Sequence, residues 1–230
     1  MNAVSIINKL VSIVKGESFN LDTRIPLSYL LRLCLSRMVC LMWGSIRLRS
    51  TKCAFIHPSC VIKCSSRIKF GRNFSVGRNC YIDALSQSGL ICGNNVSIGN
   101  NTTIELTGSL KLLGKGMIIG NNVGLGTHWR YGSGMGRLLI GDDTIFGNYV
   151  SIHPENHNYK DQNIPIRLQG VRGIGVEIGK NCWIGAKATI LDGTIIGDNC
   201  VVAAGAVVRG EFPANSIIGG VPAKIIKMRI

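Results

Sequence analysis

Acidic side chains and histidines are scarce in this sequence. Its 230 residues include 12 Asp and Glu against 26 Lys and Arg, and four His, which gives a formal net charge of +14. Such a charge could bind nucleic acid through phosphates, but no aromatic–basic stacking motif or recognition helix accompanies it. Residues 1–52 hold eight of the basic residues and two acidic ones, which suits an anionic membrane surface better. We therefore expect no nucleic-acid partner. A non-enzymatic binder of acidic polymers is kept as an alternative.

Paired cysteine motifs are also absent. The nine cysteines include no Cys-x-x-Cys pair, and their odd number leaves at least one thiol unpaired in any disulfide scheme. Cys60, Cys80, Cys182 and Cys200 fall at the small position of the repeat described below, where cysteine acts as a compact apolar filler. We predict reduced core thiols in a cytoplasmic protein.

A clean apolar run of membrane-spanning length is missing as well. The stretch from Leu27 to Trp43 is interrupted by Ser28, Arg32 and Ser36, with Arg37 beside them. Two arginines near the centre of 17 residues argue against a spanning helix, and no cleavage motif for a signal peptide follows. We predict that residues 1–51 form a basic amphipathic helical segment on a membrane surface, at the inner face of the cytoplasmic membrane. Packing over the open end of a repeat stack is the compatible alternative.

What the sequence does have is an aliphatic residue every six positions. In the clearest run, which has six such residues, a small side chain comes four residues after each of the first five, and glycine directly follows three of the six. A period of six fits neither an α-helix nor an ordinary strand and is the hexapeptide signature of a parallel β-helix. The clearest run comprises Ile178, Ile184, Ile190, Ile196, Val202 and Val208.

The same period recurs upstream in shorter runs that are out of phase with one another. Each phase slip marks inserted residues that must bulge out of the stack. The longest slip separates Ile152 from Ile178, and loops on a rigid scaffold commonly carry function. We predict an all-β domain over residues 52–226, with an active-site loop at 153–175 and a tail at 227–230. The upstream runs are Ile56/Ile62/Ile68, Phe70/Val76/Ile82, Cys92/Ile98/Ile104, Leu113/Ile119/Leu125 and Ile140/Phe146/Ile152.

Residues 140–226 resemble the hexapeptide-repeat O-acetyltransferases, the group that contains maltose, galactoside and polysaccharide (O-antigen and capsule) acetyltransferases. The phrases that carry the resemblance are Asn156-His157, the block from Val176 to Ala186, the block from Val202 to Val208, and Gly220 to Lys224. The resemblance implies a left-handed β-helix, a homotrimer, and acetyl-CoA as co-substrate for transfer to a hydroxyl. The acceptor it implies is a sugar of a bacterial surface polysaccharide or its lipid-linked precursor.

Transfer of an acetyl group to a hydroxyl needs a base, and histidine is suited to that task near neutral pH. His157 lies in the long excursion and aligns with the catalytic histidine of the family, whereas His153 follows a core position and is expected to be structural. The family often has an asparagine on the acceptor side, and here Gly126-Thr127-His128 stands in that region instead. We therefore take His128 and Asn156 as candidate acceptor contacts.

The developing oxyanion needs donors, and backbone amides at corners can supply them. By resemblance, the amides of Gly185 and Ala186 contact the thioester and Trp183 lines the pantetheine channel. The nucleotide end of CoA is expected near Pro222 and a cation. A lysine usual in the family is replaced by Gly210, and we expect Arg209 to substitute for it. The other predicted CoA contacts are Ala203, Ala204, Gly205 and Lys224.

The chief rival is a metalloenzyme on the same fold, of the γ-carbonic-anhydrase type. In that reading, His128, His153 and His157 would gather a metal ion. The Trp183 block and the Pro222–Lys224 segment favour CoA chemistry, so we expect no metal.

Overall fold

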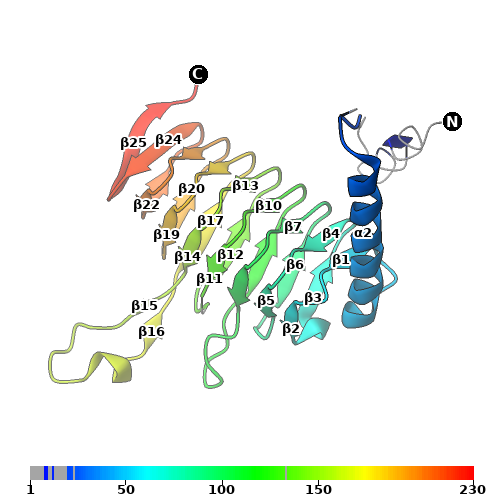
Figure 1. Ribbon diagram of the computed structural model, residues 1–230. Helices are drawn as coiled ribbons and strands as arrows, with labels where there is room; N and C mark the ends of the chain where they lie inside the picture. The colour runs from blue at the N-terminus through cyan, green and yellow to red at the C-terminus, as the bar shows by residue number, and fades with distance from the viewer. Residues whose placement is uncertain (1–7, 10–11, 13–19, 23, 133) are drawn as a thin grey trace.

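In a computed structural model, described for residues 8–9, 12, 20–22, 24–132 and 134–230, the chain winds into a three-sided prism of stacked coils (Figure 1). This confirms the predicted all-β, left-handed parallel β-helix. Each coil supplies one strand to each of three sheets, here named A, B and C, which hold nine, seven and seven strands. The chain passes from sheet C to A to B, so the prism has a C–A edge, an A–B edge and a B–C edge.

The strands are short because each covers one side of the prism. Sheet A contains β1 (Ala54–Ile56), β4 (Phe74–Val76), β7 (Ser97–Ile98), β10 (Gly124–Leu125), β13 (Ile145–Phe146), β18 (Trp183–Ile184), β21 (Val201–Val202), β24 (Ser216–Gly220) and β25 (Ala223–Met228). Sheet B contains β2 (Val61–Lys63), β5 (Tyr81–Asp83), β8 (Thr103–Glu105), β11 (Arg130–Tyr131), β14 (Ser151–His153), β19 (Thr189–Leu191) and β22 (Val207–Val208). Sheet C contains β3 (Ile68–Phe70), β6 (Leu90–Cys92), β9 (Met117–Ile119), β12 (Arg137–Ile140), β17 (Gly175–Ile178), β20 (Thr194–Ile196) and β23 (Glu211–Phe212).

The six-residue period builds the core. All six aliphatic residues from Ile178 to Val208 are buried, and so are the small residues between them. The four cysteines predicted as fillers are buried, and all nine cysteines are unpaired. At the C–A edge, the residues with left-handed backbone are mostly asparagines, such as Asn122 (φ 57°) and Asn181 (φ 52°). Several of their side chains bond from coil to coil, as between Asn181 Nδ2 and Asn199 Oδ1 at 2.8 Å, and these bonds satisfy polar groups along the edge.

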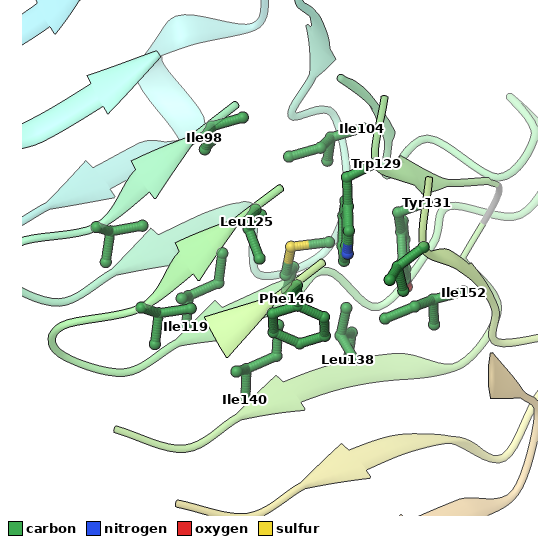
Figure 2. Packing of buried hydrophobic residues seen from close by; sticks show 14 of the residues in the cluster. Ile98, Ile104, Ile119, Leu125, Trp129, Tyr131, Leu138, Ile140, Phe146 and Ile152 are labelled. Carbon is green, nitrogen blue, oxygen red and sulfur yellow. The ribbon is translucent and has the colours of Figure 1, made fainter. Parts of the chain in front are cut away.

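One upstream run differs from its expectation. Leu113 lies in a loop and is only partly buried, whereas Ile119, Leu125 and Tyr131 share one coil as core residues. Trp129, also fully buried, takes the place of the small residue and lies edge-on to Phe146 at 5.9 Å between ring centroids (Figure 2). Leu113 belongs to the residues inserted between β8 and β9, so the core run begins at Ile119 and not at Leu113.

The insertions share one edge of the prism. Between β5 and β6, β8 and β9, β11 and β12, and β14 and β17, the chain leaves sheet B and makes a longer excursion before it enters sheet C. The last excursion contains a two-stranded antiparallel hairpin, β15 (Asn156–His157) and β16 (Val171–Arg172), and a 3-10 turn η2 (Ile166–Leu168). Figure 1 shows this hairpin projecting well beyond the prism. We refer to residues 154–174 as the hairpin excursion.

An α-helix, α2 (Leu27–Leu48), lies across the N-terminal end of the prism, where it contacts β1 (Figure 1). The 3-10 turn η1 (Ser65–Arg67) follows in the first coil. Within the described residues, α2 is the one helix long and apolar enough to cross a membrane by length and composition. Much of the predicted helical segment 1–51 lies outside the described residues, so α2 is the part of it that can be placed.

Candidate active site

His157 is carried by the hairpin excursion on the B–C edge. It is exposed on β15, where it pairs with Val171. The next residue, Asn158, closes the hairpin through its backbone N–H to the Gly170 carbonyl (3.0 Å) and its Nδ2 to the Gln169 carbonyl (3.0 Å). The hydrogen bonds of this short hairpin therefore hold the backbone of His157, and its exposed imidazole is accessible to an incoming molecule.

A buried carboxylate holds both ends of the hairpin excursion. Asp192, 5% exposed, accepts a hydrogen bond from Asn156 Nδ2 at 3.0 Å. Its other oxygen accepts from the backbone N–H groups of Ile174 and Gly175, both at 2.8 Å. Asn156 lies where the excursion leaves the prism and Gly175 where it returns, so one side chain from the next coil closes the loop. The amide nitrogen of Asn156 is thereby engaged at the hairpin base, and its acceptor contact stays a prediction.

The preceding coil supports the same base. Glu155 Oε2 accepts from the Met135 N–H at 3.1 Å, and a side chain on Gly136 would overlap the Pro154 carbonyl, so the two backbones touch there. The Gly136 carbonyl in turn accepts from the Tyr131 hydroxyl at 3.1 Å. Burial, with the nearby charge of Glu155, raises the pKa of Tyr131, so its phenol stays a proton donor. The buried side chain of Tyr131 therefore links the hydrophobic core to the base of the hairpin.

The A–B edge, by contrast, has tight corners with left-handed residues in successive coils. His128, Tyr149, Lys187 and Gly205 all have φ between 57° and 72°. A side chain on Gly147 would lie 2.5 Å from Ala186 N, and one on Gly185 would lie 2.6 Å from Ala204 N. The coils therefore stack backbone against backbone at this edge, which leaves room for a ligand to lie close to the main chain.

Free backbone donors follow from the side chains at these corners. In two earlier coils an asparagine of the next coil accepts from the corner amide: Asn100 Oδ1 from Arg78 N–H at 2.7 Å and Asn148 Oδ1 from Thr127 N–H at 3.0 Å. Ala186 and Ala204 occupy the equivalent positions later and offer no acceptor. In the described part of the chain, the N–H groups of Ala186 and Ala204 have no hydrogen-bond partner. The Gly185 N–H donates to the Val202 carbonyl at 2.8 Å, so Ala186 is the free donor of the predicted pair.

The residues predicted to contact acetyl-CoA lie together around these amides. Trp183, 55% exposed, stands on the outer face of sheet A between Ile145 and Val201. Ala203, Ala204 and Gly205 form the next corner, where Gly205 N–H donates to the Ala186 carbonyl at 2.9 Å. The β24–β25 hairpin extends the same surface, because β24 pairs with β21 and Lys224 pairs with Gly219 on it. Pro222 lies in its turn.

Arg209 does not join that group within one chain. It follows β22 and is exposed where the chain turns from sheet B toward sheet C. It therefore lies on the edge that carries the hairpin excursion. A strand of three residues with its corners spans on the order of 15 Å, so the width of sheet B separates His157 and Arg209 from Ala186.

The other two candidate histidines have separate partners. His128 stacks on Tyr149 with 4.5 Å between ring centroids, and its Nε2 lies 3.2 Å from Asn101 Nδ2 on the A–B edge. His153 Nε2 lies 2.7 Å from Ser151 Oγ, and burial together with the charge of Arg130 lowers its pKa. Across the described residues, no three His, Cys, Asp or Glu side chains come together in a way that could hold a metal ion. The metalloenzyme reading therefore lacks a ligand cluster in the residues described.

A shallow depression of about 600 Å³ lies on the outer face of sheet C, beside the return of the hairpin excursion. Lys115, Arg137, Glu177 and Glu211 line it, and none of the predicted CoA contacts does. The residues predicted to contact CoA instead lie on an open face and edge, as expected for one wall of a cleft whose other wall comes from elsewhere.

Comparisons with known proteins identify the class of enzymes to which this left-handed prism belongs. Residues 175–210 match the family model "Bacterial transferase hexapeptide (six repeats)". The chain is 31% identical over 182 residues to the putative lipopolysaccharide biosynthesis O-acetyl transferase WbbJ of Escherichia coli, which covers 76% of this chain and 79% of that protein. It is 33% identical over 95 residues to galactoside O-acetyltransferase of the same organism, covering 39% and 43% of the two chains.

Among solved structures, a mutant of AntD, an N-acyltransferase from Bacillus cereus in complex with dTDP and Coenzyme A, superposes with a TM-score of 0.52. The match covers 78% of this chain and 82% of that one at 20% identity, a likeness in fold. The chain belongs to the hexapeptide-repeat acyltransferase family, and it is an acetyltransferase.

Two features of the site were not foreseen. Asp192 follows a core strand at a corner, a position that gives no hint of contact with a loop 18 or 36 residues earlier. The only signal was an acidic residue where the surrounding repeat has small or apolar ones. The free amides likewise depend on alanine replacing asparagine at one corner, which becomes visible once the coils are aligned side by side.

Proposed function

We propose that the protein transfers an acetyl group from acetyl-CoA to a sugar hydroxyl, with His157 as the general base. The observation that carries this is the pair of free N–H groups of Ala186 and Ala204 beside the exposed Trp183, on an edge where backbone is open to a ligand. An amide donor of this kind stabilises the oxyanion that forms when a hydroxyl attacks a thioester. His157 takes the proton of that hydroxyl, and the thiolate of CoA leaves and is protonated.

The active enzyme is a homotrimer in this proposal, and each site is shared by two subunits. His157 and Arg209 lie on one edge, and Trp183 and Ala186 lie across sheet B. A neighbouring subunit that places its hairpin excursion against sheet A would complete the site, with Arg209 as a cation for the CoA phosphates. A prism with flat, partly apolar faces favours such packing. Light scattering of the active enzyme should give three times the mass of the 24.8 kDa chain, and a monomer mass would contradict the shared site.

The acceptor in this proposal is a bacterial surface polysaccharide or its lipid-linked precursor, and residues 1–51 hold the enzyme at the inner face of the cytoplasmic membrane. The support is the similarity to a lipopolysaccharide O-acetyl transferase over most of both chains, together with α2. His128 and Asn156 remain the candidate acceptor contacts.

The test is acetyl transfer from radiolabelled acetyl-CoA to a panel of glycans and aminosugars, with product linkage read by alkaline hydrolysis. An ester that is lost in mild alkali is the expected product. Stable amides alone would show an N-acetyltransferase, and release of CoA without acetylated glycan would contradict the acceptor class. Ala204→Glu tests the CoA-binding side of the site, because its carboxylate would stand beside the free amides and repel CoA.

A further inference from the structure

The helix α2 contacts the prism with an unusual side. Gly44 lies against β1 so closely that a side chain there would overlap the Ala54 carbonyl. The guanidinium of Arg37 lies over the Phe55 ring, 5.4 Å from its centroid, and Leu30 and Cys40 are buried. These four positions share one helical face, so α2 is attached to the first coil along a narrow strip.

The opposite face of α2 is apolar and points away from the protein. Its residues follow one another at spacings of four, three, four and four, which places them in one line along the helix. Each is between 53% and 69% exposed. Soluble proteins rarely leave a continuous strip of this kind in water, so it marks a contact surface. We name it the outward stripe: Leu31, Leu35, Met38, Met42 and Ile46.

Exposed basic side chains surround the same end of the prism. Residues 1–78 contain 13 Lys and Arg against two acidic residues, whereas residues 79–230 contain 13 against ten. Lys63 stands on sheet B, Lys69 on sheet C, and Arg72 and Arg78 at the two corners that flank sheet A. The single ion pair among the described residues is Arg24 with Asp22, outside this group. We name the group the basic collar: Lys52, Lys63, Arg67, Lys69, Arg72 and Arg78.

We propose that the outward stripe and the basic collar form one docking surface for an anionic lipid bilayer. The stripe lies in the interface between headgroups and acyl chains, and the collar contacts anionic headgroups. The prism then stands end-on to the membrane, since α2 lies across its end (Figure 1). The collar disfavours a second copy of this chain on the stripe, because like charges would face each other. A membrane-spanning α2 would have to give up the Gly44 and Arg37 contacts along its length.

This orientation fixes the height of the site and, resting on the proposed function, narrows the acceptor. The hairpin excursion leaves the fifth coil, four coil spacings from the first, which amounts to about 19 Å at the usual strand spacing. The width of α2 adds about 10 Å. The acetylated hydroxyl would then lie about 30 Å from the bilayer. The acceptor is therefore a lipid-linked glycan that reacts at a sugar remote from its lipid.

Vesicle binding of the full chain tests the docking surface. We expect co-sedimentation with vesicles of equimolar phosphatidylcholine and phosphatidylglycerol, and little with phosphatidylcholine alone. Leu35→Gln/Met42→Gln should weaken binding roughly tenfold or more, and Lys63→Gln/Lys69→Gln/Arg72→Gln roughly 100-fold. Matched controls are Leu110→Gln/Leu112→Gln, on exposed loop leucines, and Lys180→Gln/Lys227→Gln/Arg229→Gln, which make the same changes far from the first coil. They should bind like wild type.

Quenching by brominated lipids tests the orientation. Trp43 flanks the stripe on α2, Trp129 is buried, and Trp183 lies on the sixth coil. Trp43 should be quenched, and Trp183, observed in Trp43→Phe, should not.

Equal binding to neutral vesicles, unchanged binding of both test variants, or quenching of Trp183 would overturn the proposal. An assembly larger than a trimer that Leu35→Gln/Met42→Gln dissolves, without vesicle binding, would assign the stripe to a second copy. Loss of vesicle binding with acetyl transfer retained would reject the docking alone, whereas membrane binding without transfer would reject the proposed function alone.

Discussion

The two edges that flank sheet B are built from the same repeat yet behave differently. At the A–B edge each corner has the same length, and the coils lie so close that a Cβ added at Gly185 would stand 2.6 Å from the backbone nitrogen of Ala204 in the next coil. At the B–C edge four excursions interrupt the repeat, and the longest is held by Asp192 and Glu155. Backbone stacking therefore sets the geometry on one edge and side-chain anchoring sets it on the other. In the proposed function, the CoA thioester uses the fixed edge and the hairpin excursion on the variable edge supplies the base for the acceptor.

The largest expected effect comes from His157→Ala. Acetyl transfer should fall by about 10²–10⁴-fold, because a positioned base is lost. CoA affinity and thermal stability should change little, since the residue is exposed and outside the stacked core. His153→Ala is the matched control, and the base is misassigned if that variant loses transfer while His157→Ala keeps it.

Asp192→Ala should sharpen the contrast between the edges. Releasing Asn156 and the N–H groups of Ile174 and Gly175 would let the hairpin move, and a displacement of about 1 Å can lower turnover by up to about 10²-fold. We expect kcat to fall with CoA affinity unchanged, and Asp192→Asn to recover part of it. Asp198→Ala removes a carboxylate that accepts from Lys180 N–H at the C–A edge and should leave kcat intact. A loss of CoA affinity in Asp192→Ala with normal kcat would contradict the positioning role.

Gly185→Ala tests the fixed edge. The added methyl would lie 2.6 Å from Ala204 N and 2.7 Å from the Val202 carbonyl oxygen, so the two coils must separate. We expect a loss of about 1–3 kcal/mol in unfolding free energy and weaker CoA binding by calorimetry. Gly132→Ala makes the same change where no atom lies within 4 Å and should be neutral in both measurements. Equal behaviour of the two variants would show that close stacking does not shape this edge.

The smallest effect concerns His153. Burial and the charge of Arg130 lower its pKa below the ordinary value of 6.5. The unfolded chain then binds the proton more readily, so this residue removes stability as pH falls through 6.5. His153→Gln should show a slightly smaller loss of thermal stability on acidification than wild type, in paired melting curves. A larger loss in the variant would mean that the imidazole is stabilised as the cation.

The sequence predicted most of the fold because the six-residue period is a local property of the chain. It placed the six residues from Ile178 to Val208 in the core and located the longest excursion. It missed Tyr131, which follows Leu125 by six residues, because this core position carries a phenol where the run was followed through aliphatic side chains. It also left open which face of α2 packs on the prism, since apolar residues occur on several faces and the packed strip depends on Gly44 meeting Ala54. For the site, the residue types were readable, but the anchor Asp192 and the separation of His157 from Ala186 depend on the tertiary structure.

The shared site is the central claim, and subunit mixing tests it most directly. His157→Ala and Ala204→Glu each remove one half of the site and should be inactive alone. If base and donor surface come from different chains, an equal mixture refolded together should regain roughly a quarter of wild-type transfer, because half of the donor sides and half of the base sides are intact. If both halves belong to one chain, every site carries a defect, and no activity above that of the separate variants would return.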